Sequence, residues 1–584
     1  MNKENPVKQR SGRRNSLVQL VLGMLIIVLV NIVGSFVFTR FDLTAEKRYS
    51  LSPATKDLVR NIDDIVYFRI YLEGEFPAGF KRLRNATREM LDEFRAYNKN
   101  IQYEFVNPSA SDNAEERNST YQMLTEKGLE PTDLQVSTKE GREQQIIFPG
   151  AIASYKANEM AVDLLNSQIG VSPEEVLNNS LQALEFKLAS AIRDLTVVRK
   201  PKVAFIRGHG ELNTKEIYDI GQALSKQYIL DLVTIDGKLG SLTERDSVSE
   251  DKTRVTNKYD AIIIAKPDSS FTEKDKFILD QFIMRGGKVL WLVDPVLASM
   301  DSLESAESTI GLAWDLNLDD MLFNYGVRIN PDLIMDLNAL PIPLRTGQVG
   351  NQPKIDFFPW YFFPLITPNV KHPIVSNLNS IKTEFISSMD TIKVAGVKKT
   401  ILLKTSPYSR SVSTPVLISL SILENEPDER EYSGPERPVA VLLEGKFGSN
   451  FENRIPPEIQ FNREIDFIAE SKPTRMIVVS DGDIIKNQLH FSQGYPLPLG
   501  YDQYTGETFG NKDFILNAMD YLVDESGLIS IRSREIKLRQ LDMTRVNNNK
   551  LSWQVFNLII PVLLVLCYGL VRLYIRRRKY TSER

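Results

Sequence analysis

The sequence is poor in the side chains that carry most redox and metal chemistry. It has one cysteine, Cys567, and three histidines, His209, His372 and His490. One cysteine cannot form an intrachain disulfide, a CxxC redox pair or a cysteine-based zinc site. The three histidines are too far apart to show a metal-ligand spacing. Most thiol and metallohydrolase chemistries are therefore excluded, and we expect no metal and no cofactor.

Two further motifs and one charge pattern are missing. There is no G-x-x-x-x-G-K-[ST] phosphate-binding loop and no G-x-S-x-G nucleophile elbow. Lys+Arg number 71 and Asp+Glu 75, which leaves a net charge of -4. That balance removes the whole-chain electrostatic argument for nucleic-acid binding. We predict a protein that is not an enzyme and that does not bind nucleic acid.

Two long uncharged runs stand near the ends of the chain, at residues 17–38 and 551–571. Each would form about 30 Å of helix, which matches the hydrocarbon core of a membrane. The first run has no small-residue cleavage site, so an uncleaved anchor is favoured over a signal peptide. The second precedes an arginine-rich tail, which favours a membrane span over a buried core helix. The sequence therefore predicts two transmembrane helices.

The charge of the two tails predicts the orientation. Residues 1–16 and 572–584 are both rich in lysine and arginine. Basic flanks of membrane helices stay on the cytoplasmic side. Both termini are therefore expected in the cytoplasm, and the long region between the helices is expected on the other side of the membrane.

The region between the helices reads as two kinds of α/β structure. Residues 39–63 form a polar collar with a short helix, and residues 64–170 follow a β-α-β-α-β-β order. That order is thioredoxin-like, but Glu75 to Gly79, after the first strand, hold no CxxC, so redox chemistry is not expected. Residues 171–200 read as a helical link.

The second half predicts a doubly wound parallel sheet of the Rossmann or amidotransferase type. Strands and helices alternate over residues 201–310, as in βαβ units. Residues 311–540 read as further α/β structure, either a separate domain or one unit with 201–310. The predicted fold class is α/β, with thioredoxin-like and doubly wound external domains between two transmembrane helices.

One strand-to-helix turn is a candidate ligand site. Gly208, His209, Gly210 and Glu211 follow a buried strand and precede a predicted helix. Ligands bind at the carboxyl ends of strands in open α/β sheets, and helix N-termini favour anions. The more ordinary interpretation is a tight βα turn with Glu211 as an early-helix charge. Similarly, Asp481-Gly482-Asp483 could hold a cation, but a turn with solvated carboxylates is the stronger interpretation.

Two groups of residues are candidate interfaces. In the first predicted membrane helix, Asn31, Gly34 and Ser35 lie close together, and small and polar residues favour helix packing in lipid. In the external region, an aromatic run between two prolines could enter a lipid interface or clasp an apolar partner. Its alternative is a strand packed in the core. The aromatic candidates are Trp360, Tyr361, Phe362 and Phe363.

The order of several segments resembles a known family. It is similar to the auxiliary family of an ABC-type transport system, which includes the GldG type of gliding-motility proteins from Bacteroidetes. The segments that carry the resemblance are DLTAEKRYSLS (42–52), RGHGE (207–211), FTEKDKFILDQFIMRGGKVLWLVDP (271–295), FFPWYFFP (357–364) and GNKDFILNAMDYL (510–522).

The resemblance implies partners and a location. It implies a multi-span ABC permease and a cytoplasmic ATPase, in the bacterial inner membrane, with a large periplasmic region. It also implies a substrate- or partner-binding auxiliary role linked to gliding motility, with an envelope polymer or motility and secretion proteins as further partners. Two alternatives stay open: an envelope hydrolase or transferase that uses His209 and Glu211, and a purely structural tether.

Overall fold

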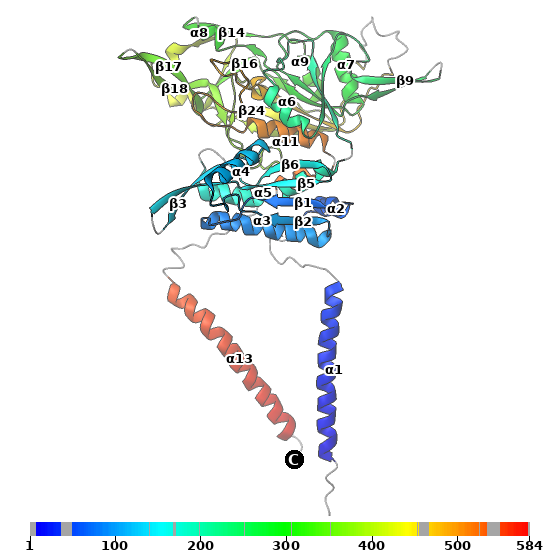
Figure 1. The fold of residues 1–584 in the computed structure, drawn as a ribbon. Helices are drawn as coiled ribbons and strands as arrows, with labels where there is room; N and C mark the ends of the chain where they lie inside the picture. Colours follow the sequence, from blue (N-terminus) through cyan, green and yellow to red (C-terminus); the bar gives the residue numbers. More distant parts are fainter. Residues whose placement is uncertain are drawn as a thin grey trace, which may run out of the picture. The chain divides into compact units, whose positions relative to one another are not determined.

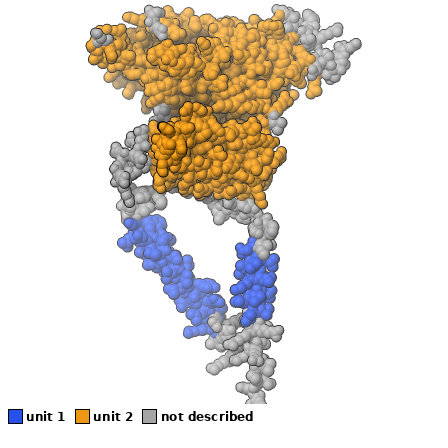
Figure 2. Space-filling model, in the orientation of Figure 1, with its two compact units in different colours: residues 1–48, 535–584 blue, residues 49–534 orange. Residues whose placement is uncertain are grey.

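The computed structural model divides the chain into two compact units (Figure 2). Residues 1–48 and 535–584 form one unit, and residues 49–534 form the other. The described residues are 8–36, 50–138, 141–166, 171–197, 199–249, 252–304, 306–350, 352–452, 454, 466–524, 526–533 and 549–581.

The terminal unit contributes two helices, α1 (Lys8–Phe36) and α13 (Lys550–Thr581). Among the described residues, one stretch is long and apolar enough to cross a membrane: Lys550–Ile575, with a mean hydropathy of 2.3. This supports the C-terminal span. Among the described residues of α1, the apolar stretch is Leu17–Asn31, so the expected first span is not confirmed. Residues 37–38 of the expected first span, and residues 1–7 and 582–584 of the basic tails, lie outside the described residues.

The first part of the large unit is a four-stranded sheet in the order β2-β1-β5-β6. Strand β1 is parallel to β2 and antiparallel to β5. The β-α-β-α start of the expected order is observed, but four strands follow α4 where two were expected. The elements are β1 (Val66–Ile70), α3 (Ala78–Tyr97), β2 (Ile101–Phe105), α4 (Ala114–Glu126), β3 (Thr132–Thr138), β4 (Gly141–Ile147), β5 (Gly150–Tyr155) and β6 (Asn158–Asp163).

Two more helices belong to this small-sheet lobe: α2 (Pro53–Arg60) and α5 (Pro173–Thr196). Ser52 caps α2 by accepting a hydrogen bond from the Thr55 amide, with proline at the first helical position. Glu185 of α5 accepts hydrogen bonds from the Ser52 amide, at 2.6 Å, and from the Thr55 hydroxyl, at 2.8 Å. Helix α5, expected as a link, is thus packed against the lobe.

The lobe is completed by a segment from the other end of the unit. The short 3-10 helix η4 (Leu528–Ser533) buries Leu528 and Ile531 in the same hydrophobic cluster as Leu51 and the strands of the small sheet. The chain therefore enters and leaves the unit 49–534 through one hydrophobic core.

The second part is a seven-stranded sheet in the order β21-β24-β25-β12-β11-β7-β8. Neighbouring strands from β25 to β8 are parallel, and β24 and β21 are added antiparallel. This confirms the predicted parallel sheet. The strands are β7 (Lys202–Arg207), β8 (Ile229–Thr234), β11 (Ala261–Ala265), β12 (Lys288–Leu292), β21 (Val397–Lys404), β24 (Pro438–Gly445) and β25 (Thr474–Val479).

Helices cover both faces of this sheet. Residues of α6 (Tyr218–Ser225) and α11 (Asn511–Val523) belong to one buried cluster, and residues of α7 (Glu273–Met284) and α9 (Asp319–Tyr325) belong to another. Alternate side chains of the central strands enter the two clusters, for example Ile263 the first and Ile264 the second. The fully buried strand β11 explains the unbroken apolar run at residues 261–265.

Most of the remaining strands lie in the long segment between β12 and β25. The longest pair, β17 and β18, forms a hairpin that reaches out on one side of the unit (Figure 1). The other elements are β9 (Thr243–Ser249), β10 (Lys252–Asn257), β13 (Val296–Leu297), α8 (Asp301–Glu304), β14 (Ser308–Ala313), β15 (Val327–Ile329), β16 (Asp332–Asp336), β17 (Ala339–Val349), β18 (Gln352–Ile366), β19 (Ile381–Lys382), β20 (Met389–Thr391), β22 (Ser409–Ser413), β23 (Val416–Ser419), η1 (Leu420–Leu423), η2 (Glu429–Tyr432) and η3 (Asp483–Ile485).

The role of η4 in the small-sheet core is testable with one substitution. Leu528→Ala removes a fully buried side chain and should lower the free energy of unfolding by about 2–5 kcal/mol. Leu417→Ala, the same change at an exposed position of β23, should cost much less. Chemical denaturation of the full chain measures both. Equal, small losses for the two variants would show that η4 does not contribute to the core.

Candidate functional site

The turn after β7 does not have the geometry expected from the sequence. Helix α6 begins at Tyr218, so Glu211 is not in the first turn of the helix that follows this turn in the sequence. Gly210 has φ +72, and a Cβ there would overlap the carboxylate of Asp268. The turn is closed over the neighbouring strand end, because the Asp268 amide donates to the His209 carbonyl at 2.9 Å.

His209 lies between two carboxylates. Its Nε2 is 3.3 Å from Asp275 Oδ2, and its Nδ1 is 3.5 Å from Glu211 Oε1. The ring stacks on Phe271, with 3.7 Å between the centroids. Asp275 also accepts hydrogen bonds from the Gly237 amide, at 2.8 Å, and from the Thr272 hydroxyl, at 2.7 Å. Thr272 caps α7, because its hydroxyl accepts a hydrogen bond from the Asp275 amide at 3.2 Å. The Asp275 carboxylate in the first turn of the same helix anchors the histidine.

The electrostatics of this triad favour a charged ring. Burial disfavours the imidazolium, but contacts with Asp275 and Glu211 outweigh it and raise the pKa of His209 to about 9. Burial likewise disfavours the ionised forms of Glu211 and Asp275, yet contact with His209 lowers the pKa of both carboxyl groups. A protonated ring with both nitrogens facing carboxylates has no lone pair for a substrate proton. The arrangement is suited to holding the β7 turn against α7.

A second charged cluster lies at the carboxyl ends of the central strands. Lys266 follows β11, Asp294 follows β12, and Asp481 and Asp483 follow β25. The Lys266 ammonium is 3.2 Å from Asp294 Oδ2 and also pairs with Asp483. Asp481 accepts hydrogen bonds from the amides of Asp483 and Glu384. Asp481 and Asp483 are buried, so the expectation of solvated carboxylates was wrong.

Burial and neighbouring charges shift the pKa values of this cluster in different directions. Burial, reinforced by the charges of Asp294 and Asp483, raises the pKa of Asp481 well above its usual range. Burial also raises the pKa of Asp294 to about 6, against the pull of Lys266. For Asp483, the attraction of Lys266 overcomes burial and lowers the pKa. Among the described residues, no group of three or more His, Cys, Asp or Glu side chains is placed to hold a metal ion.

A pocket opens beside this cluster, and we name it the β17 pocket. Its volume is about 540 Å³, which is in the range of small-molecule sites. Part of its lining is apolar and comes from the β13–α8 connection, β17, β18 and η1: Met300, Leu303, Leu340, Ile342, Phe363 and Leu420. The other part is polar and includes Glu216, Glu384, Lys486 and Asp502.

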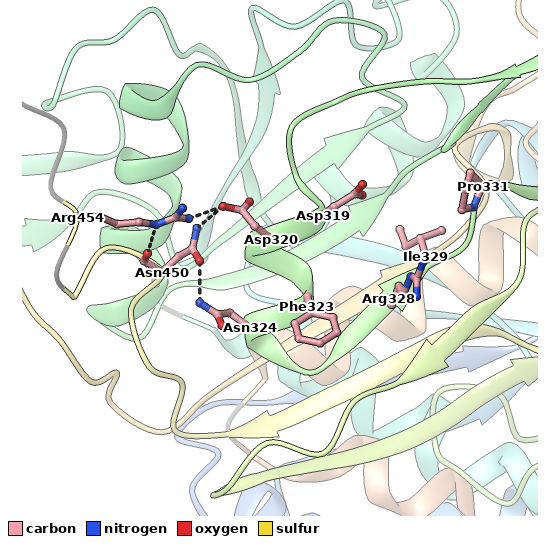
Figure 3. Close-up of a pocket in the computed structure, with 9 residues that line it drawn as sticks. All are labelled: Asp319, Asp320, Phe323, Asn324, Arg328, Ile329, Pro331, Asn450 and Arg454. Carbon is pink, nitrogen blue, oxygen red and sulfur yellow. Dashed lines mark hydrogen bonds and ion pairs between the residues drawn. The ribbon is translucent and has the colours of Figure 1, made fainter.

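A second hollow, of about 590 Å³, lies beside α9, and we name it the Phe323 pocket (Figure 3). Phe323 is half-exposed in it, and Asp319 and Arg328 also line it. Figure 3 shows that Asp320, Asn450 and Arg454 are bonded to one another at one side. The polar side chains on this side of the pocket are therefore already hydrogen-bonded within the protein.

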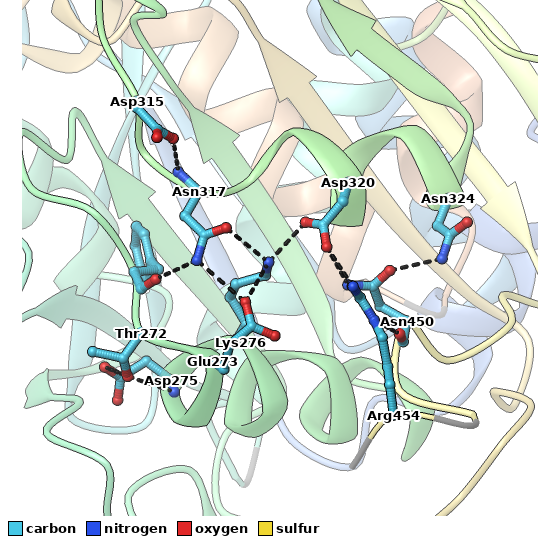
Figure 4. A network of polar contacts seen from close by, with 11 residues as sticks. Thr272, Glu273, Asp275, Lys276, Asp315, Asn317, Asp320, Asn324, Asn450 and Arg454 are labelled. Atoms are coloured by element: carbon cyan, nitrogen blue, oxygen red, sulfur yellow. Dashed lines mark hydrogen bonds and ion pairs between the residues drawn. The ribbon is translucent and has the colours of Figure 1, made fainter. Parts of the chain in front are cut away.

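The wall of the Phe323 pocket is continuous with a buried network around Lys276 (Figure 4). The fully buried Lys276 ammonium donates to Glu273 Oε1 at 2.9 Å, to Asn317 Oδ1 at 3.2 Å and to Asp320 Oδ1 at 2.8 Å. Burial opposes charge on Asp320, but bonds from Lys276, Arg454 and Asn450 hold its pKa at about 2. The network joins α7 to α9 and is satisfied without a ligand.

The aromatic candidates lie in the interior. Trp360, Tyr361, Phe362 and Phe363 of β18 are all buried in one hydrophobic cluster. Their burial agrees with the core interpretation and gives no support to an interface role in this conformation. Phe357, earlier on the same strand, is 51% exposed. Exposed and buried side chains do not alternate along the second half of β18, because both faces of the strand are buried there.

The membrane-helix candidates are only partly described. The Asn31 side chain donates to the carbonyl of Ile27 at 2.9 Å, one turn earlier in α1. Gly34 and Ser35 lie in α1, but their side chains are outside the described residues. Their role in an interface stays a prediction.

Sequence reasoning missed the residues that converge on the strand ends. Lys266, Asp294, Glu384 and Lys486 were not selected, although Lys266 and Asp294 follow a buried central strand within two positions. A search for charged residues immediately after apolar strands would have found Lys266 and Asp294. Glu384 and Lys486 come from irregular segments, and their convergence depends on the tertiary fold.

The charge of His209 predicts a pH dependence of stability. A raised pKa in the folded state stabilises the fold below the unfolded pKa of about 6.5, and this contribution is lost as the pH rises through about 9. We expect His209→Gln to lower the free energy of unfolding by at most about 3 kcal/mol at pH 6 and by little at pH 10. Denaturant unfolding across this range measures the difference, with His490→Gln as the control. Parallel curves for His209→Gln and the wild type would contradict the charged triad.

The comparisons with known proteins agree with the two parts of the large unit. A domain of unknown function matches residues 45–154, and the family described as "ABC-type uncharacterized transport system" matches residues 200–518. An uncharacterized protein of Borreliella burgdorferi is 22% identical over 579 residues, which cover 97% of this chain and 99% of that protein. The N-terminal domain of mmIFT52 aligns with 55% of this chain and 98% of its own length, at 12% identity and a TM-score of 0.30. Because the family match covers more than half of the chain, the protein belongs to the ABC-type uncharacterized transport system family.

Proposed function

We propose that the protein is a non-enzymatic, membrane-anchored accessory subunit of an ABC-type transporter. The family match over residues 200–518 supports an accessory component of such a system. The observation that carries the proposal further is the shared core of Leu51 and η4. Because both ends of the unit 49–534 leave one hydrophobic core, a helix at each end can enter the same membrane.

The finer topology follows from this arrangement. We place α1 in the membrane as a second span, in addition to the stretch Lys550–Ile575 of α13. Both basic tails then lie in the cytoplasm, and the unit 49–534 lies on the outer side of a bacterial inner membrane. The four-stranded sheet order, with its parallel β1–β2 pair, supports a thioredoxin-like lobe.

The proposed partners are a multi-span permease and a cytoplasmic ATPase. The sequence has no phosphate-binding loop, so ATP hydrolysis is assigned to another subunit. Two helices are too few to line a translocation path, so they are expected to pack on a permease. The resemblance to GldG-type proteins adds a link to gliding motility, with an envelope polymer or secretion proteins as further partners.

The alternative of a hydrolase that uses His209 and Glu211 has less support. The ring is buried, stacked on Phe271 and flanked by Asp275 and Glu211. A general base needs a free nitrogen near the working pH. The triad therefore favours a structural role for this turn.

Co-purification tests the accessory role and its membrane contact together. We expect the tagged full chain, purified from its native host, to retain a permease and an ATPase. Replacing Asn31, Gly34 and Ser35 by leucine keeps α1 apolar but fills the small-residue face, so less permease should be retained. One such polar contact contributes only about 0.6 kcal/mol, so the triple change is needed. Quantitative mass spectrometry measures the retained partners.

The matched control replaces Ile26, Val30 and Val33 of the same helix by leucine. This variant should retain the partners as the wild type does. Absence of any permease or ATPase from the wild-type preparation would contradict the accessory role. Full retention by the Asn31, Gly34 and Ser35 variant would contradict only the helix contact.

A further inference from the structure

The β17 pocket has one wall that is unusual for a protein-binding groove. Among the described strands, β17 lies at the edge of its sheet, and Leu340 to Leu344 line the pocket. Pro341 is opposite Pro359, and because neither has an amide hydrogen, this pair cannot be hydrogen-bonded. The backbone groups of Pro341 and Pro343 therefore point to the free edge, where they offer carbonyl groups and no donors.

The free edge of β17 disfavours binding of an extended peptide as an added strand. Strand addition needs alternating donors and acceptors along the edge, and proline is one of the residues that block it. The wall instead offers apolar surface from β17, β18, η1 and the loop before α8. A hydrocarbon chain can bury itself there without needing a backbone hydrogen bond.

The polar part of the pocket has hydrogen-bonding capacity that the fold does not use. No described residue donates a hydrogen bond to the Glu384 carboxylate, and its ion-pair partner, Lys382 Nζ, is 3.7 Å away. Lys382 is buried, and its ammonium makes no hydrogen bond to any described residue. Lys486 Nζ is 3.6 Å from Asp483 Oδ1 and 3.7 Å from Glu216 Oε1, which is beyond direct hydrogen bonding.

The charges that line the pocket are mainly negative. Glu216, Glu384 and Asp502 are carboxylic acids, whereas Lys486 is the one basic side chain among the described lining residues. Asp502 is already engaged, because it accepts from the amide and the hydroxyl of Thr505, each at 2.8 Å. Glu216 accepts from the Asn213 amide at 2.8 Å. Glu384 and Lys486 are thus the charged lining residues whose side chains make no hydrogen bond to a described residue. A ligand that pairs with both residues needs a hydrogen-bond donor for Glu384 and an acceptor for Lys486 on the same head group.

We propose that the β17 pocket binds a single-chain amphiphile whose head group carries both an ammonium and an anionic group. The apolar chain lies along Leu340, Ile342 and Phe363, the ammonium donates to Glu384, and the anionic group accepts from Lys486. The biological meaning of this ligand rests on the proposed accessory function. Binding of the amphiphile to the pocket does not depend on that function.

Binding of a labelled lysolipid tests the assignment. The full chain is placed in phosphatidylcholine nanodiscs, and lauroyl-lysophosphatidylethanolamine is titrated, with empty nanodiscs subtracted. We expect saturable binding of one molecule per chain. Because a hydrogen bond to a charged group contributes about 1.5–3 kcal/mol, Glu384→Gln should weaken binding about tenfold or more. Lauroyl-lysophosphatidylglycerol, which lacks the ammonium, should also bind about tenfold more weakly.

Two further variants make the outcome decisive. Met300→Trp, at the partly exposed rim, should fill the apolar part of the pocket and abolish saturable binding without touching Glu384. Glu436→Gln is the matched control, because Glu436 also pairs with a lysine, Lys404, but does not line the pocket. Thermal unfolding of each variant checks that it is folded.

Several results would overturn the proposal. They are unchanged binding in Glu384→Gln or in Met300→Trp, equal binding of the two lysolipids, or preferential binding of an apolar tetrapeptide. None of these results would affect co-purification of a permease and an ATPase. The lipid-binding proposal and the accessory role are therefore tested independently.

Discussion

The packing of η4 into the small-sheet core is the constraint on which the rest of the architecture depends. Leu528 and Ile531 come from the end of the unit 49–534, and Leu51 comes from its beginning, yet they share one buried cluster. The small sheet is therefore incomplete without a segment that is more than 350 residues away in sequence from its last strand, β6. This closure brings both exits of the chain to one lobe and leaves the seven-stranded sheet as an insertion between them.

Buried charge pairs hold the turns at the carboxyl ends of the parallel strands. His209 links the β7 turn to α7 through Asp275, and Lys266 links the ends of β11, β12 and β25 through Asp294 and Asp483. Such pairs contribute little net stability against an apolar core, but breaking one partner is costly. They fix the loops beside the β17 pocket, so its polar and apolar parts keep their relative positions.

The sequence predicted the elements with a strong local signal. The alternation of strands and helices over residues 201–310 was predicted, because burial of β11 on both faces and the Thr272 cap of α7 leave direct patterns in the sequence. The start of α6 was placed too early, because the residues after Gly210 form turns that are held by tertiary contacts. The burial of Asp481 and Asp483 was missed, because it depends on Lys266, which lies more than 200 residues earlier.

The central claim is that both ends of the unit 49–534 lead to the same membrane, with the unit on the outer side. Thiol labelling in a Cys567→Ser background tests it directly, because Cys567 is the only native thiol. Single cysteines replace Ser11, Ser299 and Ser582, and a membrane-impermeant maleimide is added to cells with a permeabilised outer membrane. The account predicts that Ser299→Cys reacts at once, whereas Ser11→Cys and Ser582→Cys react only after the inner membrane is opened. Reaction of either terminal cysteine in sealed cells, or protection of the cysteine at 299, would contradict it.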